Sequence, residues 1–214
     1  MKTVLIYDGS FKGLLTAVYT VFEKDVQNVV ISREEQADPG LFTCTLHIET
    51  DPLKASGVWR SLRLKAGSGA CDQLYKAFLS ELKGAENGIL EYVALAYGEE
   101  HFQPDTSSAA CVKKIAYAAQ MVSRSEQRCY DYVCNAFQEN HGKWIKIQPD
   151  FNVLPLLAKR LRNERSDLAW VLYDLKRSYG FHYDMETLEP VFEAPVGEAD
   201  MPVLTHMQSG LKVS

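Results

Sequence analysis

The sequence predicts a protein between the α/β and α+β classes. It should have an N-terminal strand–helix unit, a central helical region and a C-terminal three-stranded antiparallel meander. Three observations predict this: an apolar run at residues 3–7 with helical spacing directly after it, several amphipathic segments in the middle, and three short β-rich runs near the end. A chain of 214 residues with 46% hydrophobic and 24% charged residues is typical of a globular protein with a sizeable core.

The first element is a buried strand over Thr3–Tyr7, which is short, apolar and rich in β-branched residues. The turn Asp8-Gly9-Ser10 leads into a helix, with Asp8 or Ser10 as its N-cap. The residues at helical spacing are Phe11, Leu14, Leu15, Val18 and Phe22. Asn28–Ser32 and Phe42–Glu49 are expected to form two further strands.

The middle of the chain is predicted to be helical. Amphipathic patterns cover Leu53–Leu64, Cys71–Leu82 and Glu86–Tyr97, with glycines between them. A polar connector at residues 101–108 makes the region near 99–108 the expected subdomain boundary. The longest periodic segment follows it, and Glu126 falls on the stripe that should face the core. A buried carboxylate needs a partner, so we expect Glu126 to be paired, hydrogen-bonded or at a cavity wall. The apolar members of the stripe are Val112, Ile115, Ala119, Val122, Cys129, Val133 and Ala136.

After a short strand at Lys143–Ile147, Asp150–Asn152 should cap a helix from Val153 to about Arg162, with Pro155 in its first turn. Three consecutive runs then predict the β-meander. They are Leu168–Tyr173, Tyr179–Tyr183 and Leu188–Phe192. We expect residues 1–193 to form a single globular domain and residues 194–214 to form a poorly ordered tail.

Charge and composition exclude several classes of protein. The net charge of −5 argues against a non-specific DNA-coating protein, so any nucleic-acid contact must come from a local basic patch. The N-terminus has no secretory signal, and no apolar run reaches the length of a membrane span, so we expect a cytoplasmic protein. The five cysteines lack Cys-x-x-Cys spacing and the five histidines lack ligand spacing, so the sequence predicts neither a metal site nor a cofactor.

Four polar residues are candidates for a catalytic centre. Asp8 and Ser10 follow a strand at the start of a helix, a place that can bind an anion or present an acid. The same residues are equally suited to a turn and a helix cap, which is the more common role. Glu126 beside Arg128 suits an acid next to a phosphate-binding base, or else a carboxylate tied to a neighbouring helix. With Asp150 these residues make up the predicted polar centre of an enzyme acting on a nucleotide or nucleic-acid base.

A basic stretch between Lys159 and Arg177 is the candidate for nucleic-acid or partner binding, together with Arg128. Lys176 and Arg177 lie in the turn that begins at Asp174, close to Tyr179 and other aromatic residues. Cations that meet phosphates and rings that stack on bases would suit a nucleic-acid strand, and Arg162 adds charge. The alternative is a solvated hairpin turn beside aromatic residues of the sheet core.

Four stretches in fixed order resemble a bacterial family labelled "probable DNA metabolism protein", which contains a domain of unknown function. They are Tyr7–Leu15, Leu74–Glu81, Pro149–Leu156 and Trp170–Gly180. Members of that family are commonly encoded beside a radical S-adenosylmethionine protein thought to modify or repair DNA. In other bacteria a similar domain precedes a uracil-DNA-glycosylase-like domain. The resemblance implies a DNA-repair accessory role, with DNA and the radical S-adenosylmethionine protein as expected partners.

The chain departs from that family in two places. The family's Glu-x-His-Arg signature reads Glu126-Gln127-Arg128 here, and residues 196–214 lack the family's basic, aromatic tail. Both changes reduce positive charge, which favours action with a partner over independent DNA binding. Three hypotheses therefore stay open at this level. They are the DNA-repair accessory protein, the enzyme with the polar centre, and a non-catalytic protein-interaction module.

Overall fold

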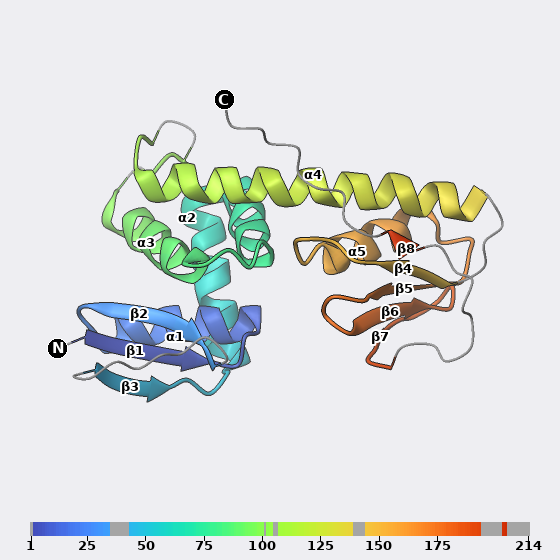
Figure 1. Cartoon of the computed structure of the whole chain (residues 1–214). Helices are drawn as coiled ribbons and strands as arrows, with labels where there is room; N and C mark the ends of the chain where they lie inside the picture. The colour runs from blue at the N-terminus through green and yellow to red at the C-terminus, as the bar shows by residue number, and fades with distance from the viewer. Residues whose placement is uncertain are drawn as a thin grey trace, which may run out of the picture. The chain divides into compact units, whose positions relative to one another are not determined.

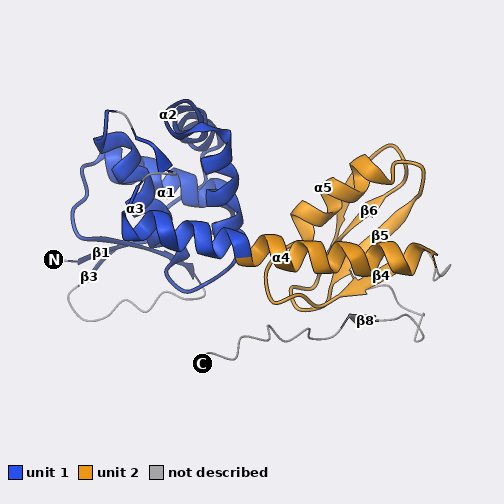
Figure 2. Ribbon diagram, turned by 90° about the horizontal axis from the view of Figure 1, so that it is seen from above, with its two compact units in different colours: residues 1–120 blue, residues 121–214 orange. Residues whose placement is uncertain are grey.

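A computed structural model describes residues 2–34, 43–100, 102–104, 107–138, 144–193 and 203–204. The chain divides into two compact units, residues 1–120 and 121–214 (Figure 2). Their border falls inside the long helix α4 (Ala110–Gln138), downstream of the connector at 99–108 that the sequence offers as a boundary. The single domain over 1–193 stays a prediction. Apart from residues 203–204, the predicted tail lies outside the described residues.

Unit 1 contains a parallel three-stranded sheet and its helices (Figure 1). Its elements are β1 (Lys2–Tyr7), α1 (Phe11–Glu23), β2 (Val29–Arg33), β3 (Thr43–His47), α2 (Pro52–Leu79), α3 (Ala85–Gly98) and the first part of α4. The strand order β2-β1-β3 makes β1 central, and its residues Val4–Tyr7 are all buried, as expected for a parallel strand. Helix α1 connects β1 to β2 on one side, whereas β3 is added on the other side of β1. The order in which strands are added to the sheet therefore changes direction at β1.

The sequence around residues 8–15 explains the start of α1. Ser10 has extended backbone angles, and its hydroxyl accepts a hydrogen bond from the amide of Gly13, so Ser10 is the N-cap. The buried face of α1 includes Leu14, Leu15 and Val18. Phe11 packs edge-on against Trp59 and Tyr75 of α2. These contacts position the carboxyl end of β1 beside the first turn of α1.

The segment from Pro52 to Leu79 is two helical pieces joined at Gly67, which has φ +87° and ψ 167°. Only glycine adopts this region readily, because a Cβ atom would clash with the backbone. Asp51 begins the first piece by accepting hydrogen bonds from the amides of Leu53 and Lys54. The two helices predicted at 53–64 and 71–82 are therefore confirmed in outline, and the glycine between them has a defined role.

Unit 2 contains the last part of α4 and a mixed five-stranded sheet in the order β7-β6-β5-β4-β8. Its further elements are β4 (Trp144–Ile147), α5 (Leu154–Glu164), β5 (Trp170–Asp174), β6 (Tyr179–Tyr183), β7 (Leu188–Val191) and β8 (Val203–Leu204). Strands β5, β6 and β7 pair antiparallel, so the predicted meander is confirmed. Both β4 and β8 add to it in parallel, a pairing that the sequence does not reveal.

The mixed α/β class that the sequence predicts is the observed one. One local prediction is wrong: Asp150–Asn152 does not cap α5, whose N-cap is Val153 and makes no side-chain capping bond. The chain turns there through backbone bonds, because the Val153 amide donates to the Phe151 carbonyl. Among the described residues, no helix is both long enough and apolar enough to cross a bilayer.

Candidate functional site

Asp174, at the end of β5, organises a polar cluster of unit 2. Its side chain is fully buried, and one carboxylate oxygen accepts hydrogen bonds from the amides of Lys176 and Arg177. The other oxygen lies 2.8 Å from Nη1 of Arg177. The carboxylate therefore fixes the β5–β6 turn and neutralises the guanidinium inside it.

Both basic residues of this turn reach across to the connection between β4 and α5. Arg177 donates from Nη1 to the carbonyl of Pro149 and from Nη2 to the carbonyl of Asp150. The ammonium of Lys176 lies 2.8 Å from the same Asp150 carbonyl. The Arg177 side chain is only 10% exposed, whereas Lys176 is exposed. Arg177 is thus a clamp between two loops, and its role as a cation for external phosphate stays a prediction.

Tyr179 strengthens the same clamp. Its hydroxyl donates to Oδ1 of Asn152 at 2.5 Å, and its ring meets that of Phe181 edge-on. The stretches 149–156 and 170–180, which lie far apart in the chain, consequently form one cluster. Its polar members are half-buried or exposed at Asp150, Asn152 and Lys176.

Helix α4 borders this cluster with Glu126, Arg128 and Cys129. The pKa of the Cys129 thiol is raised to about 11, mainly by burial; the charge of Arg128 opposes this rise, and three carboxylates contribute to it. The three are those of Asp174, Asp150 and Glu126. The carboxylates therefore lie near enough to α4 to act on the thiol, and Cys129 is protonated at neutral pH.

Helices α4 and α5 are joined by Arg160. Its guanidinium stacks 3.5 Å from the ring of Tyr130, donates to Gln127 and pairs with Glu164, which accepts the Tyr130 hydroxyl. Three other cations of these two helices differ from Arg160, because they are exposed at the surface and form no ion pair with any other described residue. They are Arg128, Lys159 and Arg162.

In unit 1, Asp8 lies at the carboxyl end of β1, beside the change of direction in the sheet where α/β proteins usually bind ligands. Its carboxylate accepts the amide of Ser10 at 2.9 Å and the hydroxyl of Thr50 at 2.8 Å. Partial burial alone would raise the pKa of Asp8, but these hydrogen bonds outweigh it and lower the pKa. Gly13 makes room for the carboxylate: a Cβ there would lie 2.2 Å from Oδ1.

A second polar group lies at the ends of β1 and β2. Tyr7 and Arg33 are register partners, and both bind Oε1 of the buried Glu86, at 3.3 Å from the Tyr7 hydroxyl and 2.9 Å from Arg33 Nε. Burial, then the charge of Glu86, raises the pKa of Tyr7 far above its ordinary value. The phenol is therefore neutral, and the group ties α3 to the sheet.

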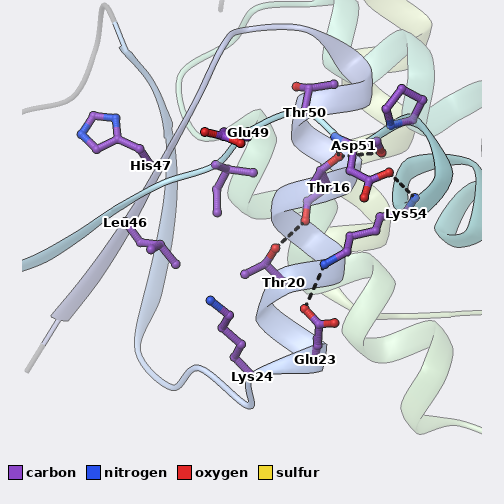
Figure 3. A pocket seen from close by; sticks show the side chains of 12 residues that line it. Thr16, Thr20, Glu23, Lys24, Leu46, His47, Glu49, Thr50, Asp51 and Lys54 are labelled. Atoms are coloured by element: carbon purple, nitrogen blue, oxygen red, sulfur yellow. Dashed lines mark hydrogen bonds and ion pairs between the residues drawn. The ribbon is translucent and has the colours of Figure 1, made fainter.

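A cleft of about 570 Å³ lies between α1 and the segment that leads from β3 to α2 (Figure 3). Thr16 and Thr20 of α1 line it, although they are only 3% and 7% exposed. Leu46 lines the opposite side, and Lys24 and Glu49 lie at different ends of the hollow. Within the described ranges, no group of three or more histidine, cysteine, aspartate or glutamate side chains could hold a metal ion.

The predicted site residues are thus divided between the two units. Asp8 and Ser10 belong to unit 1, whereas Glu126 and Asp150 belong to unit 2, so neither unit contains the whole predicted polar centre. The predicted binding residues all lie in unit 2: Arg128, Arg162, Asp174, Lys176, Arg177 and Tyr179. Thr50, Arg33 and Glu86 were not predicted, because their partners are distant in the sequence and no local pattern marks them.

The part of the chain that contains the polar cluster of unit 2 matches a known protein family. Residues 83–199, more than half of the chain, match the family described as "Domain of unknown function (DUF4130)". The chain belongs to this family. The matched residues include α3, α4 and the polar cluster of unit 2, whereas the sheet of unit 1 lies outside them. No curated protein and no solved structure matches the chain significantly.

Proposed function

We propose that this protein is a nucleic-acid-binding accessory protein of DNA metabolism that works with a radical S-adenosylmethionine protein. The observation that carries the proposal is the contrast between two sets of cations in unit 2. Arg177 and Arg160 are neutralised within the protein, whereas Arg128, Lys159 and Arg162 are exposed and have no ion pair among the described residues. Unpaired surface cations are what phosphate binding needs, since the affinity comes from neutralising phosphates and releasing counterions.

The positions of these cations support the same proposal. Gln127 of α4 contacts Arg160 of α5, and Arg128 and Lys159 are the sequence neighbours of these two residues. Lys159 and Arg162 are three residues apart on α5, a spacing that puts them on neighbouring parts of one helix surface. The clamp around Asp174 holds the exposed Lys176 at the edge of the same unit. We refer to the exposed cations Arg128, Lys159, Arg162 and Lys176 as the basic surface of unit 2.

The test is a salt titration of binding to single- and double-stranded DNA, followed by fluorescence anisotropy, with and without the purified radical S-adenosylmethionine protein. We expect the triple variant Arg128→Ala/Lys159→Ala/Arg162→Ala to lose about 2 to 3 units of the slope of log K against log salt. The matched control removes three exposed lysines of unit 1, Lys83, Lys113 and Lys114, and should keep the slope. Absence of binding at low salt under both conditions, or equal slopes for the two triple variants, would overturn the proposal.

A second candidate function is an enzyme that acts on a nucleotide or nucleic-acid base. The position of Asp8 favours it, because this ionised carboxylate lies at the carboxyl edge of a parallel sheet. The test is incubation with nucleotides and single-stranded oligonucleotides, analysed by mass spectrometry, for the wild type and Asp8→Asn. Turnover that disappears in the variant, while circular dichroism shows that the variant is still folded at the assay temperature, would support the enzyme. No turnover by the wild type would reject it.

A further inference from the structure

The aromatic rings beside the basic surface of unit 2 are engaged in other contacts. The part of α4 in this unit contains Tyr130, Tyr132 and Phe137, and α5 contains no aromatic residue. The guanidinium of Arg160 lies 3.5 Å from the centroid of the Tyr130 ring. That of Arg165 lies 5.2 Å from the centroid of the Phe137 ring, and the hydroxyl of Tyr132 is buried. Guanidinium groups therefore lie over Tyr130 and Phe137 where a nucleic-acid base would stack.

The rings near Lys176 are likewise part of the fold. Tyr173 of β5 is only 3% exposed. Tyr179 donates its hydroxyl to Asn152, and its ring meets that of Phe181 edge-on with 6.0 Å between the centroids. Both tyrosines that flank this turn in the sequence are thus used in packing, so the contact that the turn offers to a ligand is the charge of Lys176.

The two helices carry more cations than carboxylates. Residues 121–138 of α4 and 154–164 of α5 contain five arginine and lysine residues and three carboxylates. One carboxylate, that of Glu164, is paired with Arg160 at 3.0 Å. Arg124 is exposed and lies one turn before Arg128, whose Nε donates to the Arg124 carbonyl at 3.3 Å. The helix pair is therefore positive on a chain whose net charge is −5.

The two forms of DNA differ in what they offer to such a surface. A single strand exposes its bases, and proteins that bind it gain much of their affinity by stacking the bases on aromatic rings. A duplex keeps its bases stacked inside and carries about one negative charge per 1.7 Å of its axis, so cations alone can bind it. The basic surface of unit 2 has the cations, and the rings of the adjoining helices and turn are covered or packed. Its chemistry therefore fits the duplex better than the single strand.

We propose that the basic surface of unit 2 binds double-stranded DNA through the phosphates and binds single-stranded DNA more weakly. This inference rests on the nucleic-acid-binding function proposed above and names its substrate class. Arg160 contributes to the preference because it covers the Tyr130 ring, while its own charge is balanced by Glu164. Phosphate contacts carry no sequence information directly, so the preference holds for duplexes of any sequence.

The first experiment compares a DNA duplex of about 20 base pairs with each of its separated strands, by fluorescence anisotropy on the full chain at several salt concentrations. We expect the duplex to bind at least about fivefold more tightly at the lowest salt concentration, since its charge density is higher. For the same number of phosphate contacts, the slope of log K against log salt for the single strand should be about 0.8 of that for the duplex. Equal or tighter binding of the single strand would overturn the inference and leave the proposed function standing. No binding of either form would refute both.

The second experiment uncovers the Tyr130 ring. Arg160→Ala/Glu164→Ala removes a cation and its paired carboxylate together, so the net charge of the surface stays the same. We expect the affinity for the single strand to rise at least about threefold, because a base can now stack on Tyr130, whereas the affinity for the duplex changes less than about twofold. Adding Tyr130→Leu should remove the rise. Circular dichroism checks that both variants are folded, and if they are not, the comparison of duplex and single strand decides alone.

Phe192 provides the control for a ring outside the helix pair. It is 72% exposed, follows β7 and precedes Glu193. Phe192→Ala should leave both affinities unchanged. The inference is contradicted if this variant loses binding to the single strand, or if the affinity for the single strand stays the same after the Tyr130 ring is uncovered. Either result shows that the covered rings of α4 do not set the preference.

Discussion

Asp174 and Arg177 form a 2.8 Å ion pair inside unit 2, three residues apart across the β5–β6 turn. The carboxylate is fully buried, and the same guanidinium donates to the Pro149 and Asp150 carbonyls of the β4–α5 connection. A single buried carboxylate therefore determines the arrangement of two loops that belong to different parts of the sequence. The first prediction concerns the energetic weight of this pair.

Asp174→Ala should destabilise unit 2 by about 3 to 5 kcal/mol, because it removes the buried carboxylate that pairs with the largely buried Arg177. Urea denaturation followed by tryptophan fluorescence measures this, since Trp170 begins the same strand. Asp184→Ala is the control, because Asp184 accepts the backbone amides of the next turn in the same way but is exposed. The loss of stability in this variant should be clearly smaller than in Asp174→Ala. Equal losses in the two variants would contradict the role of the buried pair.

Gly13→Ala should destabilise unit 1 although alanine is the better helix former. The new Cβ would meet Oδ1 of Asp8 at 2.2 Å and the Thr50 hydroxyl at 2.8 Å, so the carboxylate must leave its hydrogen bonds. We expect a cost of about 1 kcal/mol or more. In the background Asp8→Ala this cost should become smaller, because only the approaches to Thr50 and Tyr7 remain, and a double-mutant cycle of unfolding free energies measures the coupling. Additive effects of the two substitutions would refute the close approach.

Two glycines of α2 should respond in opposite ways to alanine. Gly67→Ala forces a Cβ into a backbone region that only glycine adopts readily and should cost about 1 to 3 kcal/mol. Gly69 has no positive φ and open space at its Cβ position, so Gly69→Ala should stabilise by roughly 0.5 to 1 kcal/mol. Thermal denaturation by circular dichroism compares the two. A shift of both melting temperatures in the same direction would contradict the break at Gly67.

The lowered pKa of Asp8 makes part of the stability of unit 1 depend on pH. Because the folded protein binds the Asp8 proton more weakly than the unfolded chain, the stabilisation is present above the unfolded pKa of about 3.9. It is lost as the pH falls through the lower pKa of the folded state. Asp8→Asn should therefore be less stable than the wild type at pH 7, and the difference should shrink toward pH 3. Unfolding free energies from urea titrations at the two pH values measure it, and a constant difference would argue against the linkage.

The strands and helices were largely predictable because their signals are local. The alternation at residues 170–192 needs only neighbouring residues to indicate a meander, and the run at 3–7 needs only its own apolar character. The cap of α5 was predicted wrongly for the same local reason. Asp150–Asn152 suits a cap by composition, but Asn152 binds Tyr179 and the Asp150 carbonyl accepts Lys176 and Arg177. These tertiary contacts engage the Asn152 side chain and the Asp150 backbone, and Val153 occupies the N-cap position instead.

The candidate site was predictable residue by residue but not as an arrangement. Sequence identified Asp8 and Ser10 at a strand–helix junction, and Lys176 and Arg177 in a turn. It could not show that Thr50 would bind Asp8, or that Arg177 would reach the carbonyls of Pro149 and Asp150, because these partners are distant in the sequence. The proposal of nucleic-acid binding therefore rests mainly on the exposed cations Arg128, Lys159 and Arg162, and less on the turn with Lys176 and Arg177 that the sequence favours.

The sequence by itself determined the mixed α/β class and the order of most elements. It also marked the stretches 149–156 and 170–180 as two parts of the family resemblance. These properties follow from side-chain periodicity and backbone preference, which act over a few residues. Only the tertiary structure decided that the first sheet is parallel and that β4 joins the meander. It also decided that the Arg177 clamp unites the two marked stretches. Strand pairing and the Arg177 clamp depend on contacts between residues distant in the chain, and their energies are settled only when those residues are brought together and water is excluded.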